Sequence, residues 1–404
     1  MKIAMIGHKK VPSRLGGVEI HVEEIGARLA AKGHEVDVYN RAVHGFEQTN
    51  YRGMNLKYIN AYGKRGIYAL IYSTKAALAV SVKDYDIIHF HALGPTAAGI
   101  IPLIVGKNLV STVHGLDWKR SKWNKAAVLF LKMGEWVAGR LFHRTIVVSE
   151  PLTSYFQKKY KNHHRFIYIP NGIDIQTVQS QPEQNTYAKH IRREYGVESG
   201  DYYLFVSRLV PEKACHTLLE AFKHVRTNKK LIIVGDNPED KVYVKRLERM
   251  AQDDLRVRMI GFKGMEELIK LYTHAFCYIL PSEVEGLPIS LLEAMSHGCF
   301  CLTSDIKENK TVLNDFGRTF RAEDVRDLQK SLQSIEKESG TISEEYGQGS
   351  KGLHQIKHMR ETYNWDEVAE QTEQVYINLL KIQASQNSNK KSLNQGNQKS
   401  SMKL

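Results

Sequence analysis

The stretch from Phe276 to Thr303, FCYILPSEVEGLPISLLEAMSHGCFCLT, decides the fold of this chain. An apolar run over Phe276–Leu280 is followed by a helical pattern over Pro288–Ser296 and by a second apolar run over Cys299–Thr303. Neither run alternates strictly between apolar and polar residues, as is typical of strands covered on both faces of a parallel sheet. Strand, helix and strand in this order indicate an α/β domain.

The same alternation extends through the second half of the chain and occurs separately in the first half. The other strand patterns of the second half cover Tyr202–Ser207, Lys230–Val234 and Arg256–Ile260, with helical patterns over Lys213–Arg226, Asp240–Gln252 and Met265–Thr273. The first half has strand patterns over Lys2–Ile6, Glu35–Tyr39, Asp86–Phe90, Leu109–Val113, Arg144–Val148 and Arg165–Ile169, and helical patterns over Val18–Ala31 and Ala126–Gly139. Because single cores stop growing near ~250–300 residues, a chain of 404 residues favours two domains. We predict two doubly wound, Rossmann-like domains facing each other across a cleft.

A turn signal at Pro170-Asn171-Gly172 marks the boundary between the predicted domains. Residues 1–172 then form the first domain and residues 173–364 the second. Residues 384–404 are rich in Gln, Asn, Ser and Lys. Because this segment has too few apolar side chains to offset the cost of ordering, we expect a disordered polar tail.

Charge and composition narrow the class of partner. The formal net charge of +13 indicates a polyanionic partner, such as a phosphorylated substrate or an anionic membrane surface. No nucleic-acid recognition motif accompanies this charge, so no nucleic acid is expected. The amino terminus does not read as a signal peptide, and no apolar run reaches the ~18 residues of a membrane span, so we expect a cytoplasmic protein. The cysteines form no C-x-x-C pair and are expected to be buried and reduced: Cys215, Cys277, Cys299 and Cys301.

Two acidic residues frame the helix pattern that follows Phe276–Leu280. Glu285 lies on the loop before the helix, Pro288 suits the first turn, and Glu293 lies inside the helix. A helix start offers free N–H groups and a positive dipole end to a diphosphate or a sugar oxygen. Carboxylates accept hydrogen bonds from hydroxyl groups, so this pair suits sugar and ribose hydroxyls, although Glu-x7-Glu alone also fits a solvated helix.

Cations and glycines follow two other strands. Arg208 and Lys213 come after Tyr202–Ser207, where an Arg fork and a Lys point charge can neutralise a diphosphate. Taken alone, they fit an ordinary surface loop equally well. Gly16 and Gly17 follow the first strand and let backbone N–H groups approach a phosphate, although a plain turn explains them as well. The chain has neither a G-x-G-x-x-G fingerprint nor a Walker A motif.

Two polar motifs end strands of the first half. His114 and Asp117 follow Leu109–Val113 and are expected to point into the cleft. A structural role for a single histidine is the alternative. Asn171 and Asp174 lie at the domain crossover, where Asp174 either faces the cleft or caps the turn.

No metal ion is expected. His89 and His91 form an H-x-H pair, but the sequence places no carboxylate or third ligand with them. No Asp-x-Asp motif stands in a suitable position either.

In this order, the motifs resemble glycosyltransferase family 4, which has the GT-B fold and retains the anomeric configuration of the sugar. The resemblance covers about residues 1–382 and is most specific at Ser207–Lys213 and Glu285–Glu293. It implies a retaining hexosyltransferase of cell-surface polysaccharide synthesis that uses a nucleotide diphosphate sugar and needs no metal or other cofactor. We favour a UDP-sugar, with GDP-mannose as the alternative. The resemblance also implies that a final helix near Trp365–Ile382 crosses back to complete the first domain.

The resemblance assigns donor roles to residues of the second domain. Arg208 and Lys213 would hold the diphosphate and stabilise the leaving group, and Glu293 would bind the ribose. The transferred sugar would be held by Glu285 and by the backbone N–H groups of Gly286 and Leu287.

The first domain would supply the other side of the reaction. Gly16 and Gly17 would close over the distal phosphate, and His114 would orient the sugar near its anomeric carbon. No enzyme nucleophile is identifiable, so we favour attack of the acceptor from the side that the diphosphate leaves. Fixed cations and a helix start would stabilise the charge on that leaving group.

The acceptor is expected on the first domain. Tryptophans and cations interleave from Trp118 to Lys125, before the amphipathic Ala126–Gly139 stretch. This pattern suits peripheral attachment to the inner face of a membrane and a lipid-linked glycan acceptor, although it also fits a solvated helix start. The candidate acceptor-side residues are Asp117, Trp118, Asn171 and Asp174.

Two alternatives remain for the function. A GT-B sugar-nucleotide epimerase would use the same donor site without an acceptor. A structural or coat protein would retain the fold without turnover. The complete set of motifs favours the transferase over both.

Overall fold

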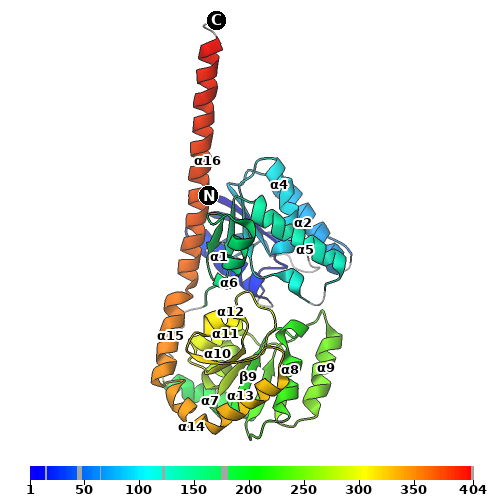
Figure 1. Cartoon of the computed structure of the whole chain (residues 1–404), viewed down its shortest axis with the longest axis vertical. Helices are drawn as coiled ribbons and strands as arrows, with labels where there is room; N and C mark the ends of the chain where they lie inside the picture. The colour runs from blue at the N-terminus through cyan, green and yellow to red at the C-terminus, as the bar shows by residue number, and fades with distance from the viewer. Residues whose placement is uncertain (14–15, 43–47, 64, 121–122, 174–180, 402–404) are drawn as a thin grey trace.

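The computed structural model describes residues 1–401 apart from 14–15, 43–47, 64, 121–122 and 174–180. Two separate sheets, each covered by helices, lie one above the other in Figure 1. The strand order is β3-β4-β2-β1-β5-β6-β7-β8 in the first sheet and β11-β10-β9-β12-β13-β14 in the second. Neighbouring described strands pair in parallel except β3 with β4. The prediction of two doubly wound α/β domains is confirmed.

In both sheets the chain first adds strands on one side of the opening strand and then crosses to its other side. The switch points lie between β1 and β5 and between β9 and β12, and this is where doubly wound sheets bind ligands. The first sheet consists of β1 (Lys2–Ile6), β2 (Glu35–Arg41), β3 (Asn50–Tyr51), β4 (Met54–Ile59), β5 (Ile87–His91), β6 (Leu109–Val113), β7 (Arg144–Val147) and β8 (Phe166–Tyr168). The second consists of β9 (Tyr202–Val206), β10 (Lys230–Val234), β11 (Val257–Met259), β12 (Cys277–Leu280), β13 (Cys301–Ser304) and β14 (Gly317–Phe320).

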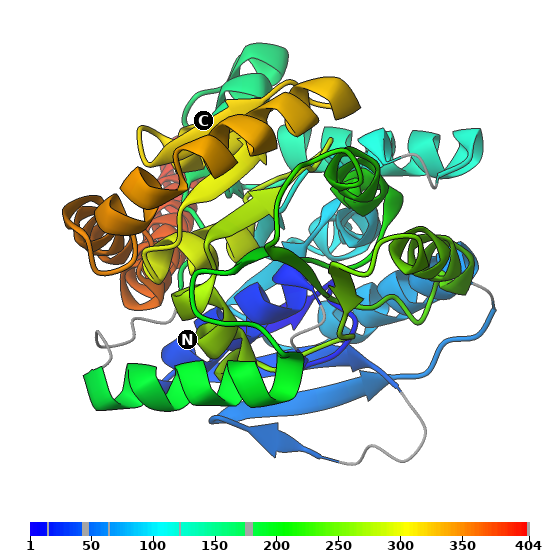
Figure 2. The ribbon, with the colours of Figure 1, turned by 90° about the horizontal axis from the view of Figure 1, so that it is seen from below.

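Helices cover both faces of each sheet, and Figure 2 shows the strands of the second domain running between them. The first half contains α1 (Gly17–Ala31), α2 (Arg65–Ser81), α3 (Leu93–Thr96), α4 (Ile100–Ile104), α5 (Lys125–Arg140) and α6 (Glu150–Tyr160). The second half contains α7 (Gln181–Tyr195), α8 (Cys215–Phe222), α9 (Lys241–Gln252), α10 (Met265–His274), α11 (Ile289–Ser296), α12 (Lys307–Leu313), α13 (Val325–Lys337), α14 (Ser339–Glu345), α15 (Ser350–Thr362) and α16 (Trp365–Ser401). Single 3-10 turns lie at Ala97–Gly99, Asp117–Lys119 and Pro211–Lys213.

Successive residues of the central strands pack into different apolar clusters. In β1, Ile3 and Met5 join the cluster on the α1 and α16 side, while Ala4 and Ile6 join the cluster on the α2 side. The central strand β9 alternates in the same way between the two clusters of the second domain. Burial on both faces explains why these strands read as uninterrupted apolar runs.

Three strands were missed by the sequence patterns: β4, β14 and the two-residue β3 that pairs with β4. In β4 a buried face alternates with half-buried polar residues, because one side of this outer strand is less covered. In β14, the sequence GRTF contains a single apolar residue, and its position beside β13 comes from tertiary pairing. All three lie away from the switch points, so the candidate site does not depend on them.

The last helix returns to the first domain. Its residues Trp365, Val368 and Tyr376 pack into the apolar cluster that contains β1 and α1. Arg28 of α1 donates to Asp366 at 2.6 Å. Where the chain leaves the first domain, the Ile173 N–H donates to the carbonyl of Tyr363 at 2.8 Å, so the two crossings between domains lie side by side.

The tail expected to be disordered from residue 384 differs in the structure. The backbone continues α16 to Ser401, and Figure 1 shows this end of the helix standing clear of both domains. The segment contains no proline and is rich in Lys, Gln and Ser, so no residue forces the helix to stop.

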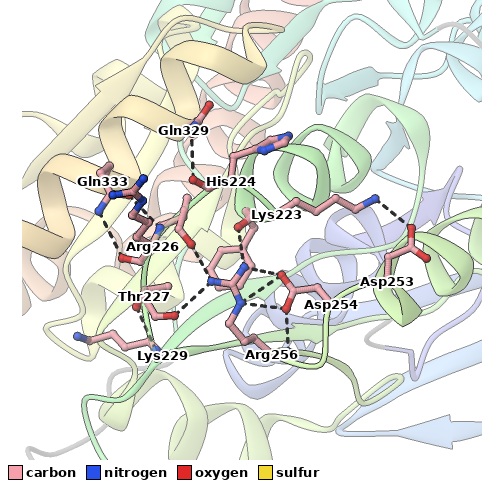
Figure 3. Close-up of polar contacts among 12 residues, drawn as sticks. Lys223, His224, Arg226, Thr227, Lys229, Asp253, Asp254, Arg256, Gln329 and Gln333 are labelled. Atoms are coloured by element: carbon pink, nitrogen blue, oxygen red, sulfur yellow. Dashed lines mark hydrogen bonds and ion pairs between the residues drawn. The ribbon is translucent and has the colours of Figure 1, made fainter.

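An arginine before β11 ties the end of α8 to the sheet (Figure 3). Arg256 donates through Nη1 to the carbonyl of Val225 at 2.7 Å and through Nη2 to that of Phe222 at 3.1 Å. Its guanidinium also pairs with Asp254 at 2.6 Å and lies over the Phe222 ring. The hydrogen bond from Arg256 lowers the pKa of Asp254. A lowered carboxyl pKa means that this contribution is present at neutral pH and is lost as the pH falls through that lowered pKa.

We expect Arg256→Ala to destabilise the second domain by on the order of 2–3 kcal/mol, because carbonyls at the end of α8 lose charged donors. Urea unfolding followed by circular dichroism measures the shift. Lys223→Ala, which removes the exposed pair with Asp253 shown in the same figure, should leave the midpoint nearly unchanged. Equal effects of the two variants would contradict this account of Arg256.

Candidate functional site

The second-domain motifs meet at the switch point between β9 and β12. These strands are paired in parallel, so the loops that follow them leave the same edge of the sheet. The loop after β9 carries Arg208 and Lys213, and the loop after β12 carries Glu285. The Lys213 ammonium donates to Glu285 Oε1 at 2.5 Å. Two motifs separated by more than 70 residues are thereby joined into one charged group.

This charged group is largely shielded from water. Glu285 is only 9% exposed, and the Lys213 side chain is mostly buried beside it. Arg208 is half-buried, and its Nε is a buried donor without a hydrogen-bond partner among the described residues. A buried donor without a partner is costly, so a guanidinium in this position is suited to an anionic ligand.

Helix α11 places the second acid of the motif. Glu293 is half-buried and accepts a hydrogen bond from the Tyr272 hydroxyl at 3.1 Å. Burial, followed by the charge of Glu293, raises the pKa of Tyr272 well above its usual range, so this hydroxyl stays protonated as a donor. Tyr272 therefore fixes one carboxylate oxygen of Glu293. Leu287 is buried just before the helix starts.

Motifs from the two domains are in direct contact. A Cβ on Gly286 would lie 1.7 Å from the carbonyl oxygen of His114 and 3.2 Å from the Cα of Gly115. A Cβ on Gly17, at the start of α1, would lie 3.3 Å from Ile289 of α11. Gly16 immediately precedes α1 as its N-cap. The glycine loop and the histidine motif of the first domain therefore face the start of α11.

A cluster of histidines lies behind this contact. His91 at the end of β5 and His114 after β6 approach to 3.4 Å between Nδ1 and Nε2. His21 of α1 packs edge-on against His114, with ring centroids 4.6 Å apart. Its Nδ1 lies 2.8 Å from Oδ1 of Asn171, which is buried at the crossover. Burial, first of all, lowers the pKa of His91 and His114 well below the usual range, and it lowers that of His21 to about 4. The three imidazoles are therefore neutral at pH 7.

An arginine that the sequence analysis did not single out bridges the domains. Arg120 pairs with Asp117 at 3.2 Å and approaches Glu212 of the other domain at 3.7 Å. Burial opposes its charge, but Asp117, Glu212 and Glu285 together raise the pKa of Arg120. No sequence signal marks Arg120, because its partner in the other domain, Glu212, comes from a distant loop. Asp117 thus pairs with Arg120.

The remaining acceptor-side residues are placed differently. Trp118 is half-buried and donates through Nε1 to the buried Glu135 of α5 at 2.6 Å. Trp118 and Trp123 both pack against the apolar cluster that contains residues of α5 and α6. Neither tryptophan is therefore among the exposed large apolar side chains. Asp174 lies outside the described residues. His21 and His91 were not predicted as site residues, although H-x-H at the end of a buried strand was a usable signal for His91.

Comparisons with known proteins cover both domains. A family model described as Glycosyltransferase Family 4 matches residues 15–177, and one described as Glycosyl transferases group 1 matches residues 188–351. An uncharacterized glycosyltransferase of Methanocaldococcus jannaschii is 25% identical over 399 residues, which are 93% of this chain and 98% of the relative.

Two further comparisons bear on fold and chemistry. A UDP-Gal:alpha-D-GlcNAc-diphosphoundecaprenol alpha-1,3-galactosyltransferase of Escherichia coli is 27% identical over 253 residues, covering 58% of this chain and 62% of the relative. The solved structure of sucrose-phosphate synthase from Thermosynechococcus elongatus aligns with a TM-score of 0.79 at 19% identity, covering 94% of this chain and 99% of that one.

Proposed function

Because this chain belongs to glycosyltransferase family 4 and has the GT-B fold, we propose that it transfers a hexose from a nucleotide diphosphate sugar to a glycan or lipid-linked acceptor, with retention of configuration. The family assignment and the expectation of a transferase are thereby confirmed. The observation that supports the proposal best is the joining of Lys213 to Glu285 beside Arg208, at the switch point of the second sheet.

Arg208 and Lys213 would take up the negative charge of the departing diphosphate. Both follow β9, and Arg208 has a buried donor available for an anion. Donors fixed in a site that excludes water stabilise developing charge without reorganising during the reaction, so the step needs no metal at the diphosphate. The N–H groups at the start of α11 would add to this stabilisation.

Glu285 and its neighbours would hold the transferred sugar. The carboxylate is fixed by Lys213 and accepts hydrogen bonds from sugar hydroxyls, while the Gly286 and Leu287 N–H groups serve as donors. Glu293, oriented by Tyr272, would bind the ribose hydroxyls in the same way. Both carboxylates are thus engaged in binding, which favours attack by the acceptor on the face that the diphosphate leaves.

His114 would orient the reacting sugar from the first domain. Its backbone contacts Gly286, so its position is coupled to the loop that carries Glu285. Because the imidazole is neutral at pH 7, it would act as a hydrogen-bonding group and not as a cation beside an oxocarbenium-like transition state. Gly16 and Gly17 would close over the distal phosphate from the same side.

A panel of sugar nucleotides tests the donor. A UDP-hexose at ~100 times its dissociation constant is expected to stabilise the fold by about 2.7 kcal/mol, read as a rise in Tm, and GDP-mannose is the comparison. UDP-Gal is the donor of the Escherichia coli relative, which is why UDP-sugars lead the panel. A chain stabilised by no sugar nucleotide would refute the proposed donor class, and formation of a new sugar nucleotide from donor alone would indicate an epimerase.

The first domain would also attach to an anionic membrane through α2, α4 and α5. These helices lie on the side of the first sheet opposite α16 (Figure 1). No helix in the described part of the chain is both long and apolar enough to cross a bilayer. The exposed apolar side chains are Ile67, Leu70 and Leu78 on α2, Ile104 on α4, and Leu129, Met133 and Trp136 on α5.

The charges on this face match an anionic surface. On α5, the apolar residues Leu129, Met133 and Trp136 share one side of the helix, and Lys125 and Lys132 are exposed beside them. The only acid of α5, Glu135, is fully buried, and α2 and α4 contain none. Apolar side chains flanked by cations are typical of helices that lie in a membrane interface. This surface replaces the Trp118–Lys125 segment as the proposed docking site.

Liposome flotation tests the attachment. We expect flotation with vesicles that contain anionic lipid and much less with neutral vesicles, because each cation near the surface contributes about 1 kcal/mol. Changing Leu129 and Trp136 together to Ser should reduce flotation. Leu255→Ser, which alters a 92% exposed leucine of the other domain, is the matched control. Equal flotation of the double variant and the control would rule out this face.

A further inference from the structure

An arginine at the end of β2 is held between aromatic rings and has no anionic partner. The Cζ atom of Arg41 lies 5.2 Å from the centroid of the Tyr72 ring and 5.8 Å from that of the Tyr68 ring, both on α2. The side chain is half-buried, and its Nε is a buried donor without a hydrogen-bond partner in the described part of the chain. No carboxylate among the described residues forms an ion pair with it. Because a buried donor without a partner is costly, this guanidinium is suited to an anionic ligand.

Arg41 lies at the edge of the first sheet that faces the second domain. Strands β1 and β2 pair in parallel and end at the same edge, where the Arg41 N–H donates to the carbonyl of Lys9 at 2.9 Å. The Lys9 ammonium in turn pairs with Glu239 of the second domain. Helix α2 follows β4, which is parallel to β2, so α2 also begins at this edge and turns its positive dipole end toward it. Arg41 is therefore on the acceptor side of the domain contact.

A buried histidine beside this cation offers a hydrogen-bond acceptor. The Asn40 amide group donates to the Val11 carbonyl at 2.7 Å, so its oxygen faces the Val11 N–H and His8 Nε2, each at 2.9 Å. An amide oxygen only accepts, so His8 Nε2 carries the proton and Nδ1 the lone pair. Burial, with a smaller contribution from the charge of Arg41, lowers the pKa of His8 to about 4, so the ring is neutral at pH 7. Its Nδ1 is buried and without a partner among the described residues, which suits a ligand hydroxyl.

The Arg41 guanidinium is separate from the group that would orient the donor sugar. Arg41 ends β2 and His114 follows β6, and the strand order β2-β1-β5-β6 places these strand ends about 14 Å apart, at ~4.8 Å per strand. A ligand group on Arg41 is therefore out of hydrogen-bond reach of His114. Glu19 of α1 is the acid whose charge also acts on His8. Its carboxylate accepts from the Lys9 N–H at 3.0 Å, so it is already engaged beside Arg41.

We propose that Arg41 binds a phosphate group of the acceptor and that His8 accepts a hydrogen bond from a hydroxyl next to that phosphate. The inference rests on the proposed glycosyl transfer and names the class of acceptor, a phosphate ester that carries free hydroxyl groups. The planar fork of a guanidinium matches two phosphate oxygens, and the start of α2 adds to the positive potential. Because α2 is one of the helices proposed to lie on the membrane, a phosphate that links the acceptor to a lipid would arrive on this side.

Binding is measured on the full chain by ³¹P NMR, with saturating UDP present so that Arg208 and Lys213 are occupied. The probe is glycerol phosphate, which carries one phosphate and two hydroxyl groups. We expect saturable broadening of its resonance. Arg41→Gln should weaken binding by about 10–100-fold, which corresponds to the loss of a hydrogen bond between charged groups.

Two comparisons separate the roles of the two side chains. Methyl phosphate lacks the hydroxyl groups and should bind the unaltered chain more weakly than glycerol phosphate does, and His8→Ala should remove that difference. Arg144→Gln is the matched control for a lost arginine of the same sheet. Arg144 is half-buried, begins β7 at the opposite edge and donates to the adjacent His143 carbonyl at 2.8 Å. This control should bind glycerol phosphate as the unaltered chain does.

The outcomes separate the acceptor from other sources of phosphate. Absence of saturable binding by the unaltered chain would overturn the proposal, as would equal losses in Arg41→Gln and Arg144→Gln. Weaker stabilisation of Arg41→Gln by sugar nucleotides would assign Arg41 to the donor, and weaker flotation with anionic vesicles would assign it to the membrane face. Either result would overturn its role in acceptor binding.

Two further measurements keep the test decisive. Should Arg41→Gln unfold, glycerol phosphate should still protect Arg41 of the unaltered chain from modification by phenylglyoxal, as mapped by mass spectrometry, and absence of protection would overturn the proposal. Failure of UDP to bind would count against the proposed donor alone, because binding of glycerol phosphate that depends on Arg41 can then be measured in Arg208→Ala.

Discussion

Arg208→Ala is expected to lower kcat by about 10²–10³-fold while the chain stays folded, which is the usual cost of removing one donor that stabilises transition-state charge. The half-buried guanidinium lies outside the helices and forms no ion pair within the described part of the chain, so its loss leaves the fold intact. Lys213→Ala should reduce turnover at least as much, because it also leaves the buried Glu285 carboxylate without its partner. Steady-state rates with the donor identified by the thermal panel give both values.

Lys223→Ala serves as the control for a lost lysine in the same domain, since its ammonium pairs only at the surface. It should turn over at the unaltered rate. Lys213→Ala could lose activity because the diphosphate loses a cation or because the variant partly unfolds, and melting curves separate these two causes. A chemical role lowers kcat even at temperatures where the variant is fully folded. Near-normal rates in both Arg208→Ala and Lys213→Ala would remove the proposed donor site.

Gly286→Ala is expected to remove most activity by pushing the domains apart. Its new Cβ would lie 1.7 Å from the His114 carbonyl oxygen, and the nearest atoms are backbone, which cannot rotate away as a side chain can. A misplacement of about 1 Å between reacting groups costs on the order of 10²-fold in rate. Because the clash is between domains, each sheet should keep its own stability, as read from circular dichroism and the Tm.

Gly264→Ala is the matched control. Its added Cβ would meet no atom within 4 Å, and Gly264 has an ordinary backbone conformation before α10. This variant should retain full activity. An active Gly286→Ala would mean that the contact between Gly286 and His114 is not required for transfer.

The parts of the fold set by local patterns were predictable. Buried strands such as β6 and β10 were placed with their bounds, because a run of Val, Ile and Leu covered on both faces is distinctive. β14 was not, because GRTF becomes a strand only through its neighbour β13. Local sequence thus predicts the centre of each sheet better than the outer strands.

The same distinction holds for the candidate site. Arg208, Lys213 and Glu285 were proposed because they follow buried strands, and a parallel sheet brings such loops to one edge. Arg120 was not proposed, because the interaction that gives it a role is with Glu212, which is about 90 residues away and in the other domain. His21 lies on a helix, and nothing in its neighbours in sequence indicates that β5 and β6 would bring two more imidazoles against it.

Because α16 returns to the first domain, that domain is built from two separate stretches of the amino-acid sequence. Trp365, Val368, Tyr376 and Leu379 belong to the same apolar cluster as Ile3 and Val22, although they are synthesised some 340 residues later. On the ribosome the apolar face of the first domain stays open until α16 has been translated. A stop codon shortly before Trp365 would therefore damage the amino-terminal half of the protein more than the half it interrupts.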